Sequence, residues 1–281
     1  MTTDIIDIFY SGPDGWPLCA ALVDPNHRLS TSHVVIMMHG GGPDHQSLIP
    51  LARRLCDRRA VVLPDIRGYG RSPCSENAKH TWTSYSADVM SLLDHLKVDS
   101  AIVGGAGLGA TITLRTALAH KERVRAAILI SVEDIEDDEA KAAETAFMRE
   151  FATRVREEGL HAAWAPILPN LAPVIREMVY DAIPRSTSAS IAAAAAIGED
   201  RAFRSVGELA DINMPALVIP GMDERHPIAL AKQLAHLLPH GKLAAAEMSD
   251  AIVTTEDFAR CFAPAIREFL NELSALPTAS A

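Results

Sequence analysis

The hydrophobic residues of this chain follow two kinds of pattern, which succeed one another along most of the sequence. Short apolar runs flanked by glycine, proline or aspartate are typical of buried strands, and longer stretches with apolar residues three and four positions apart are typical of amphipathic helices. The stretch Leu48, Leu51, Ala52 and Leu55 shows the helical spacing. We expect strands at residues 5–10, 18–23, 34–38, 60–63, at the start of 101–114, and at 126–131, 216–220 and 243–247.

The alternation of strand and helix patterns predicts an α/β fold with a mostly parallel sheet and helices on both of its faces. The first two strands flank the turn SGPDGWP, which favours an antiparallel hairpin at the start of the chain. Between residues 132 and 211 only helix patterns occur. We therefore expect a core made of residues 1–131 and 212–281 and an inserted helical cap made of residues 132–211.

The segment from Ala101 to Leu114, AIVGGAGLGATITL, predicts a strand, a sharp turn and a buried helix. A residue at the apex of such a turn has positive φ, and its neighbours must be small. Gly107 occupies the expected apex, and Gly105 and Gly109 flank it. The glycines therefore predict a tight strand-to-helix connection at this point.

Two further motifs follow strands earlier in the chain. The run VVIMM leads directly into His39, Gly40, Gly41 and Gly42, and the strand at residues 60–63 leads into PDIRGYGRS, which ends at Ser72. With the turn at Gly107, these motifs resemble those of the α/β-hydrolase fold family: an HGGG oxyanion loop, a D-x-R-G-x-G-x-S turn and a G-x-S-x-G nucleophile elbow. The resemblance covers nearly the whole chain and implies the fold described above.

The resemblance also implies a pocket that stabilises negative charge on a substrate oxygen. Glycines in such a loop let backbone N–H groups face the developing charge. The expected binding set, with the elbow apex and the residue after it, is Gly40, Gly41, Gly42, Gly107 and Leu108.

The usual catalytic triad of this family is incomplete in the sequence. Gly107 stands where the family has its serine, and no histidine occurs from residue 241 to the end, although the family's histidine follows the last strand. The family's acid lies three residues after a glycine, which matches Glu224 after Gly221, with Asp223 beside it. Because serine and histidine act as a unit, the sequence excludes a Ser-His-Asp esterase mechanism.

Candidate proton-transfer groups come from the two sides of the expected pocket. His45 and Asp44 follow the HGGG loop, and Glu224 and Asp250 follow the last two strands. A helix-capping or solvent-facing role is an open alternative for His45. For His226, which precedes Pro227 at the start of an expected helix, we favour a structural role.

Two other ligand classes are disfavoured by residue spacing. The stretch IVGGAGLGA resembles a dinucleotide fingerprint, but such a fingerprint belongs to the first βαβ unit of its fold. The acidic run from Glu133 to Glu139 lacks the glycine and the spacing of a calcium loop, and acids near a helix start are favourable by themselves. We expect no cofactor and no metal.

Composition narrows the range of partners. The chain has 281 residues, 48% of them hydrophobic, and a formal net charge of −10 without a basic stripe. This disfavours nucleic acid and anionic membranes and leaves a small-molecule substrate or ligand as the expected partner, with a homodimer as an open alternative. No secretory leader or membrane-spanning pattern is present in the sequence, so we expect a cytoplasmic protein.

Two hypotheses for function follow. The first is an enzyme with a degenerate triad that acts on a small organic molecule without a covalent intermediate, by hydrolysis through a positioned water or by a lyase-type step that cleaves a C–C bond or eliminates a group. The second is a non-catalytic ligand-binding relative of the hydrolases. The glycine at position 107 leaves room for a water or a substrate and favours the first, whereas the missing serine and histidine favour the second.

Overall fold

The computed structural model describes residues 5–26, 28–29 and 34–275, and within them eight strands form one sheet in the order β1-β2-β4-β3-β5-β6-β7-β8. Strands β1 and β2 form the predicted antiparallel hairpin, β2 pairs antiparallel with β4, and the other pairs are parallel. The mostly parallel sheet is therefore confirmed. The strands are β1 Ile5–Ser11, β2 Pro17–Val23, β3 Val34–Met38, β4 Ala60–Pro64, β5 Ala101–Ala106, β6 Val124–Ile130, β7 Ala216–Ile219 and β8 Gly241–Leu243.

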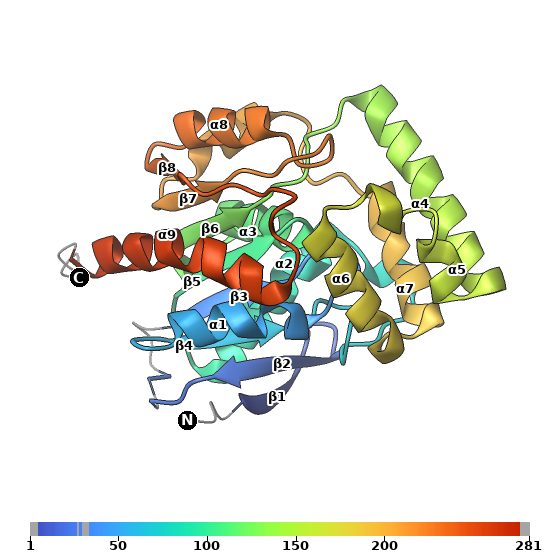
Figure 1. Ribbon diagram of the computed structural model, residues 1–281. Coiled ribbons are helices and arrows are strands. Elements are labelled where there is room, and N and C mark those ends of the chain that lie inside the picture. The colour runs from blue at the N-terminus through green and yellow to red at the C-terminus, as the bar shows by residue number, and fades with distance from the viewer. Residues whose placement is uncertain (1–4, 27, 30–33, 276–281) are drawn as a thin grey trace.

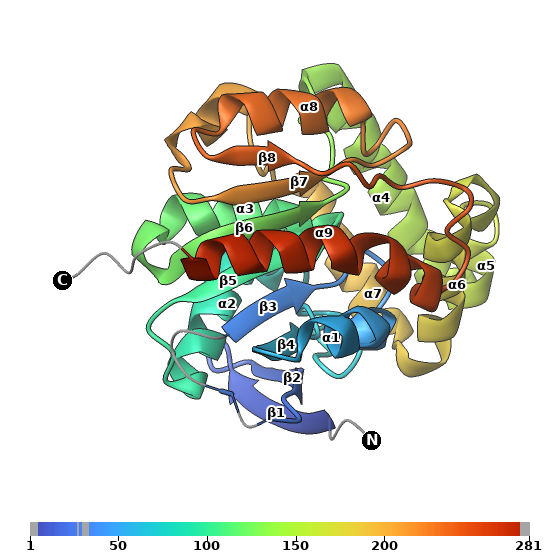
Figure 2. The same cartoon turned by 60° about the vertical axis from the view of Figure 1, so that its left-hand side comes forward.

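Helices cover both faces of this sheet (Figures 1 and 2). Helices α1 (Ile49–Leu55) and α9 (Thr255–Ala275) share a buried apolar cluster with one face. Helices α2 (Trp82–Leu96), α3 (Leu108–Ala119) and α8 (Ile228–Leu237) share a second cluster with the other face. The central strands are buried on both sides, which explains why their sequences are continuous apolar runs.

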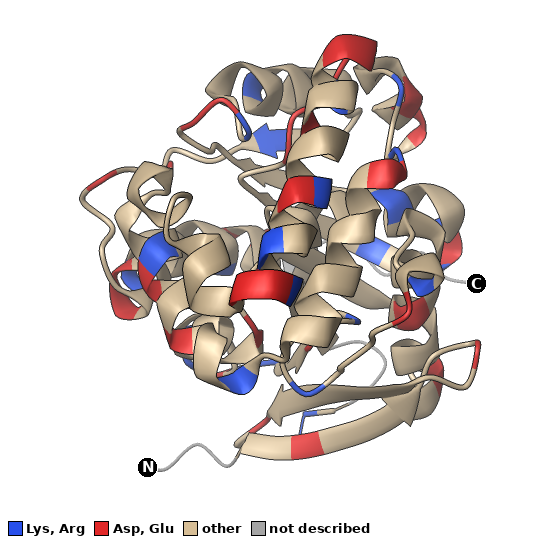
Figure 3. Ribbon diagram, turned by 90° about the vertical axis from the view of Figure 1, so that its right-hand side faces the viewer, with Lys and Arg blue, Asp and Glu red and all other residues tan. Residues whose placement is uncertain are grey.

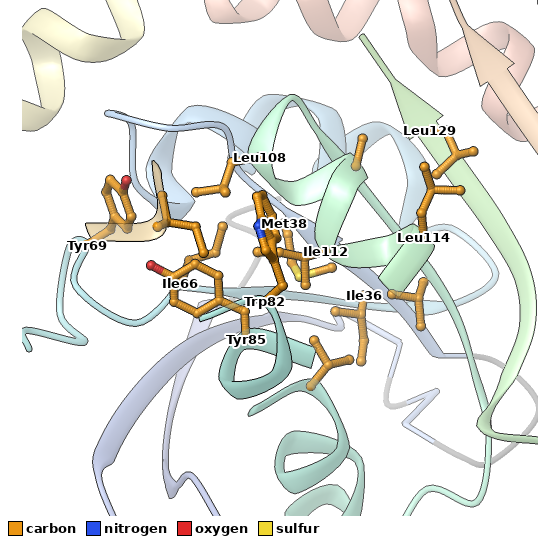
Figure 4. Close-up of a cluster of buried hydrophobic side chains, with 14 of the residues drawn as sticks. Ile36, Met38, Ile66, Tyr69, Trp82, Tyr85, Leu108, Ile112, Leu114 and Leu129 are labelled. Carbon is orange, nitrogen blue, oxygen red and sulfur yellow. The ribbon is translucent and has the colours of Figure 1, made fainter. Parts of the chain in front are cut away.

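Part of the second cluster holds the elbow helix against the sheet. Figure 4 shows Ile112 and Leu114 of α3 close to Ile36 and Met38 of β3, with Trp82 and Tyr85 of α2 beside them. All of these side chains are buried. The packing fixes the start of α3, and with it the turn that precedes the helix.

Further helices lie between β6 and β7 and gather at one end of the sheet (Figure 1). The Asp137 side chain caps the first of them by accepting hydrogen bonds from the N–H groups of Glu139 and Ala140. Part of the acidic run thus begins a helix, where carboxylates are favourable. These inserted helices are α4 Asp138–Glu158, α5 Leu160–Trp164, α6 Pro173–Ala182 and α7 Ser188–Ala194.

Short 3₁₀ helices complete the described structure. They are η1 His45–Leu48, η2 Asn77–Lys79, η3 Lys121–Arg123, η4 Leu168–Asn170, η5 Ile183–Arg185, η6 Ala195–Glu199 and η7 Val206–Asp211. In the described part of the chain, no helix is both long and apolar enough to cross a bilayer. Figure 3 shows acidic and basic residues interspersed along the inserted helices, and ion pairs such as Arg149 with Glu199 join them.

The strand predicted at residues 243–247 is wrong. Strand β8 ends at Leu243, and its partner β7 ends at Ile219, directly before Pro220. One more hydrogen bond joins the Ala244 N–H to the Val218 carbonyl, and beyond it β7 offers no further ladder partner. After Leu243, Ala244 and Ala246 pack partly buried against the core instead of pairing in the sheet, which the pattern of hydrophobic residues alone does not distinguish.

Candidate functional site

The turn between β5 and α3 has the geometry that its glycines predict. Gly107 has φ of 52° and ψ of −117°, and its N–H donates to the Ile130 carbonyl at 3.0 Å. A Cβ on Gly105 would lie 2.5 Å from the Gly109 backbone, so the chain approaches itself too closely for a side chain there. The predicted apex at Gly107 is confirmed.

The loop after β3 lies opposite this apex. A Cβ built on Gly107 would be 3.9 Å from the Gly40 Cα, and in the described residues the N–H groups of Gly41 and Leu108 have no hydrogen-bond acceptor. The His39 ring connects this loop to the turn after β4. Its Nδ1 lies 2.8 Å from the Gly40 carbonyl, and its Nε2 accepts a hydrogen bond from the Ile66 N–H at 3.0 Å. Burial lowers the pKa of His39, so this histidine stays neutral and structural. The loop and the elbow together offer free N–H donors to an anionic oxygen.

A histidine from an unexpected position completes the site. His226, in the loop between β7 and α8, has its Nε2 3.4 Å from the position of a Cβ on Gly107. Its Nδ1 lies 2.8 Å from Oδ1 of Asp223, which also accepts from the His226 backbone N–H at 2.9 Å. The hydrogen bond from His226 lowers the pKa of Asp223, so this carboxylate remains ionised and orients the ring. The pair has the arrangement of a base held by an acid.

The loop that carries His226 is folded back on itself. Asp223 and His226 form an isolated antiparallel bridge, and a Cβ on Gly221 would lie 2.4 Å from the His226 Cβ. Only glycine fits at position 221, and this close approach sets the direction of the imidazole. In the sequence, this dyad is indicated only by the spacing of Gly221, Asp223 and His226. The same spacing is compatible with an ordinary helix start, for which we favoured a structural role of His226.

A cavity of about 820 Å³ opens above these groups. Its floor includes Gly40, Gly41, Gly107, Leu108 and His226, and its walls come largely from the inserted helices. Most of the wall is apolar, including Trp82, Phe147, Phe151, Trp164, Met178 and Met222. Such a volume and lining suit a small organic molecule.

Comparison with known proteins agrees with the fold. A model of the alpha/beta hydrolase fold matches residues 33–245. The chain belongs to the alpha/beta hydrolase fold family. Within the family it is 23% identical over 163 residues to 2-hydroxy-6-oxo-2,4-heptadienoate hydrolase of Pseudomonas putida, an alignment that covers 55% of this chain and 52% of that protein.

Two further proteins are similar to this chain, one in sequence and one in structure. An epoxide hydrolase of Caballeronia sordidicola is 34% identical over 100 residues, which cover 35% of this chain and 28% of the relative. The chain thus aligns with about half or less of these curated relatives. The crystal structure of an enol-lactonase from Burkholderia xenovorans LB400 has a TM-score of 0.78 at 22% identity, covers 94% of this chain and 100% of that one, and shows the shared fold.

Asp44 and His45 do not lie where we expected them in this alpha/beta hydrolase. Neither side chain lines the cavity. His45 is buried, with its Nδ1 2.8 Å from Oδ1 of Asp65, and Asp44 accepts two hydrogen bonds from Arg185 at 2.6 and 3.1 Å. These partners hold both side chains outside the cavity lining, so the expectation that they stand over the pocket is not met.

The two acids expected from the last strands also differ in position. Glu224 lines the cavity but is exposed, and it makes no hydrogen bond to a histidine in the described residues. Its neighbour Asp223 takes the orienting position instead. Asp250 is exposed and does not line the cavity, so the structure does not bring it to Gly107.

Glu133 of the acidic run and Glu144 of α4 line the cavity. Glu144 forms ion pairs with Lys141 at 2.7 Å and with Arg225 at 2.9 Å, which connects α4 to the loop carrying His226. Burial, together with the nearby charge of Glu144, raises the pKa of Glu136 to about 7. No cluster of three or more metal-ligating side chains occurs in the described part of the chain.

Ser131 is a cavity residue that the sequence did not indicate. It follows β6, lines the cavity and has φ of 51°, a strained value for a residue other than glycine. Its hydroxyl is buried without a hydrogen-bond partner in the described residues. The apolar run before Ser131 predicts a strand but does not indicate that the serine after it has a positive φ.

Proposed function

We propose that this chain is a hydrolase that acts on a small carbonyl compound, bound in a largely apolar cavity, by direct attack of water. One observation carries the proposal: the Nε2 atom of His226 lies 3.4 Å from the Cβ position of Gly107. Since glycine has no side chain, the space where the family has its serine is open to a water molecule. The oriented imidazole beside that space is a suitable general base.

In the proposed reaction, Nε2 of His226 removes a proton from the water as its oxygen bonds to the carbonyl carbon. The carbonyl oxygen becomes negative and accepts hydrogen bonds from the N–H groups of Gly41 and Leu108. When the bond to the leaving group breaks, the imidazolium returns the proton to that group. Asp223 keeps the ring oriented and stabilises its positive charge. No covalent intermediate forms.

The relatives suggest which substrates to try first. Their names describe hydrolases of 2-hydroxy-6-oxo-2,4-heptadienoate and 2-hydroxymuconate semialdehyde, and a structural neighbour is an enol-lactonase. Each of these compounds offers an oxygen that can carry negative charge during cleavage. The apolar cavity walls and the inserted helices, acting as a cap, support a substrate of this size.

The test is to measure turnover of this panel by the wild type and by His226→Gln and Asp223→Asn. We expect kcat to fall at least ~100-fold in His226→Gln, the scale of a general base, and to fall in Asp223→Asn because the ring loses its orientation. His236→Gln, on the exposed side of α8, is the matched control and should keep full turnover. The wild type should show no burst of a covalently bound product.

Two outcomes would contradict the proposal. Unchanged kcat in His226→Gln would place the chemistry elsewhere. Binding of panel compounds without any turnover by the wild type would instead support a non-catalytic ligand-binding protein, which the loss of the serine also favours.

A further inference from the structure

A tyrosine shares the cavity with the free N–H groups. Tyr69 lies in the turn after β4, lines the cavity, and has its hydroxyl 4.0 Å from the Cβ position of Gly41. The residue is 7% exposed, and its hydroxyl makes no hydrogen bond to any described residue. In contrast, the hydroxyl of nearby Tyr85 lies 2.9 Å from Nδ1 of His80. Tyr69 thus has a polar group inside the cavity that the protein itself leaves unsatisfied.

The position of Tyr69 is fixed by its surroundings. The ring packs edge-on against His39, with centroids 5.4 Å apart, and the Tyr69 N–H donates to the Ile66 carbonyl at 2.9 Å. Gly68 and Gly70 on either side have positive φ, and a Cβ on Gly70 would lie 2.4 Å from the Asp65 carboxylate. Figure 4 shows Tyr69 at the rim of the apolar cluster, with its hydroxyl directed away from Tyr85.

A hydroxyl that faces a largely apolar cavity and has no protein partner can form a hydrogen bond only with water or a ligand. The same turn could carry phenylalanine at no loss of packing, so the hydroxyl has no role in holding the fold. Burial raises the pKa of the Tyr69 phenol above its ordinary value. The group is therefore a neutral hydrogen-bond donor at physiological pH.

We propose that Tyr69 donates a hydrogen bond to the substrate oxygen that becomes negative, on the same side of the cavity as the N–H groups of Gly41 and Leu108. This inference rests on the proposed function, because it assigns a further donor to the same site. It restricts the substrates to compounds whose reacting oxygen, when bound at the elbow, faces the turn after β4 that carries Tyr69. Hydrogen bonds to charged groups are stronger than those to neutral groups, so this contact favours the charged state over the ground state.

The first experiment compares Tyr69→Phe with Tyr85→Phe in the turnover panel. Tyr69→Phe should lower kcat about 10-fold to 100-fold with little change in KM, because the lost bond forms with the charged state. Its melting temperature should stay the same or rise, since the removed hydroxyl has no protein partner. Tyr85→Phe loses the contact with His80 and should lower the melting temperature by about 2–4 °C while kcat is unchanged.

The second experiment does not depend on turnover. Benzylphosphonate is a stable tetrahedral anion with an apolar group, and its affinity can be measured by calorimetry. We expect Tyr69→Phe to weaken its binding about 10-fold and Tyr85→Phe to leave it unchanged.

The two experiments separate this inference from the proposed function. If His226→Gln abolishes turnover but Tyr69→Phe changes neither kcat nor benzylphosphonate affinity, the role of Tyr69 is wrong and the general base stands. If no substrate is turned over but benzylphosphonate affinity falls in Tyr69→Phe, the donor stands and the hydrolytic function is wrong. A wild type that does not bind benzylphosphonate, with unchanged kcat in Tyr69→Phe, would overturn the inference.

Discussion

Gly107 has no side chain that could act as a nucleophile, but its surroundings leave room for one. The apex keeps its positive φ, and the imidazole of His226 still faces the position that a side chain would occupy. The Cβ position is in ordinary van der Waals distance of Nε2, so the space accepts a small side chain. A serine can therefore be introduced at this position and its effect measured.

We predict that Gly107→Ser alone creates a covalent esterase activity. A hydroxyl on the new Cβ would reach hydrogen-bond distance of His226, which Asp223 already orients. The variant should react with a fluorophosphonate and show a burst with p-nitrophenyl acetate. It should also lose about 1–3 kcal/mol of unfolding free energy because a side chain is strained at this φ.

Gly107→Ala is the control, with the same strain and no hydroxyl. It should lose similar stability and remain unlabelled. A folded Gly107→Ser protein that does not react with the fluorophosphonate would show that His226 is not placed to activate a nucleophile.

The site residues differ in how far the sequence could predict them. Gly107 was predicted because the apex of the turn requires positive φ, whereas the glycines after β3 were predicted from their motif and its place in the order of motifs. His226 was missed because its role depends on a turn that brings it 2.8 Å from Asp223. His45 was expected over the pocket because it is adjacent in sequence to the glycine loop, but its side chain turns toward buried Asp65.

At the scale of elements, the loop after β3 joins the sheet to the inserted helices. Gly42 has φ of 103°, and a Cβ there would lie 2.9 Å from Val179 of α6 and 3.0 Å from Trp164 of α5. Gly41, one residue earlier, has an ordinary φ, and a Cβ there would meet only the Tyr69 hydroxyl at 4.0 Å. Adjacent glycines in one motif therefore have different structural roles.

We expect Gly42→Ala to lower the free energy of unfolding by about 1–3 kcal/mol, through backbone strain and contact with the inserted helices. Gly41→Ala should change it by no more than about 0.5 kcal/mol, because neither cause is present. Urea denaturation of the two variants measures the difference. Equal losses of unfolding free energy in both variants would mean that α5 and α6 do not contact this loop closely in solution.

The elements themselves were predicted where both faces are buried. The run VVIMM gave β3 with its bounds, because every one of its residues is buried. Strand β8 was misplaced, since it lies at the edge of the sheet, is only three residues long and is mostly exposed, so no apolar pattern marks it. The hydrophobic pattern of a strand reflects how far its side chains are buried. It is therefore least informative for a strand whose side chains are mostly exposed.

At the scale of the whole molecule, the order of strands and motifs was sufficient to predict the fold, but not how the inserted helices attach to the sheet. That attachment includes an ion pair between Asp44, which caps η1 and is buried, and Arg185 of η5, which is partly exposed. The Asp44 side chain is 2% exposed, and both of its oxygens accept from Arg185. An aspartate and an arginine 141 residues apart, about half of the chain, give no sequence signal of such a contact.

The last prediction concerns this ion pair. Arg185→Met leaves the Asp44 carboxylate buried without its cation, which should lower the free energy of unfolding by about 3 kcal/mol. Because the pair connects the loop after β3 to the inserted helices, limited proteolysis within residues 132–211 should also become faster. Arg149→Met removes an exposed pair with Glu199 on the same inserted helices and should cost no more than about 1 kcal/mol.

A double variant distinguishes loss of the pair from loss of packing. Replacing Asp44 by asparagine in the Arg185→Met background removes the unpaired charge while keeping the side chain's shape and its ability to accept from the Gln46 N–H. Stability and protease resistance should then recover in part, since the cost comes mainly from the uncompensated carboxylate. If the double variant is no more stable than Arg185→Met, the arginine contributes through its contacts alone, and Asp44 does not hold the inserted helices by its charge.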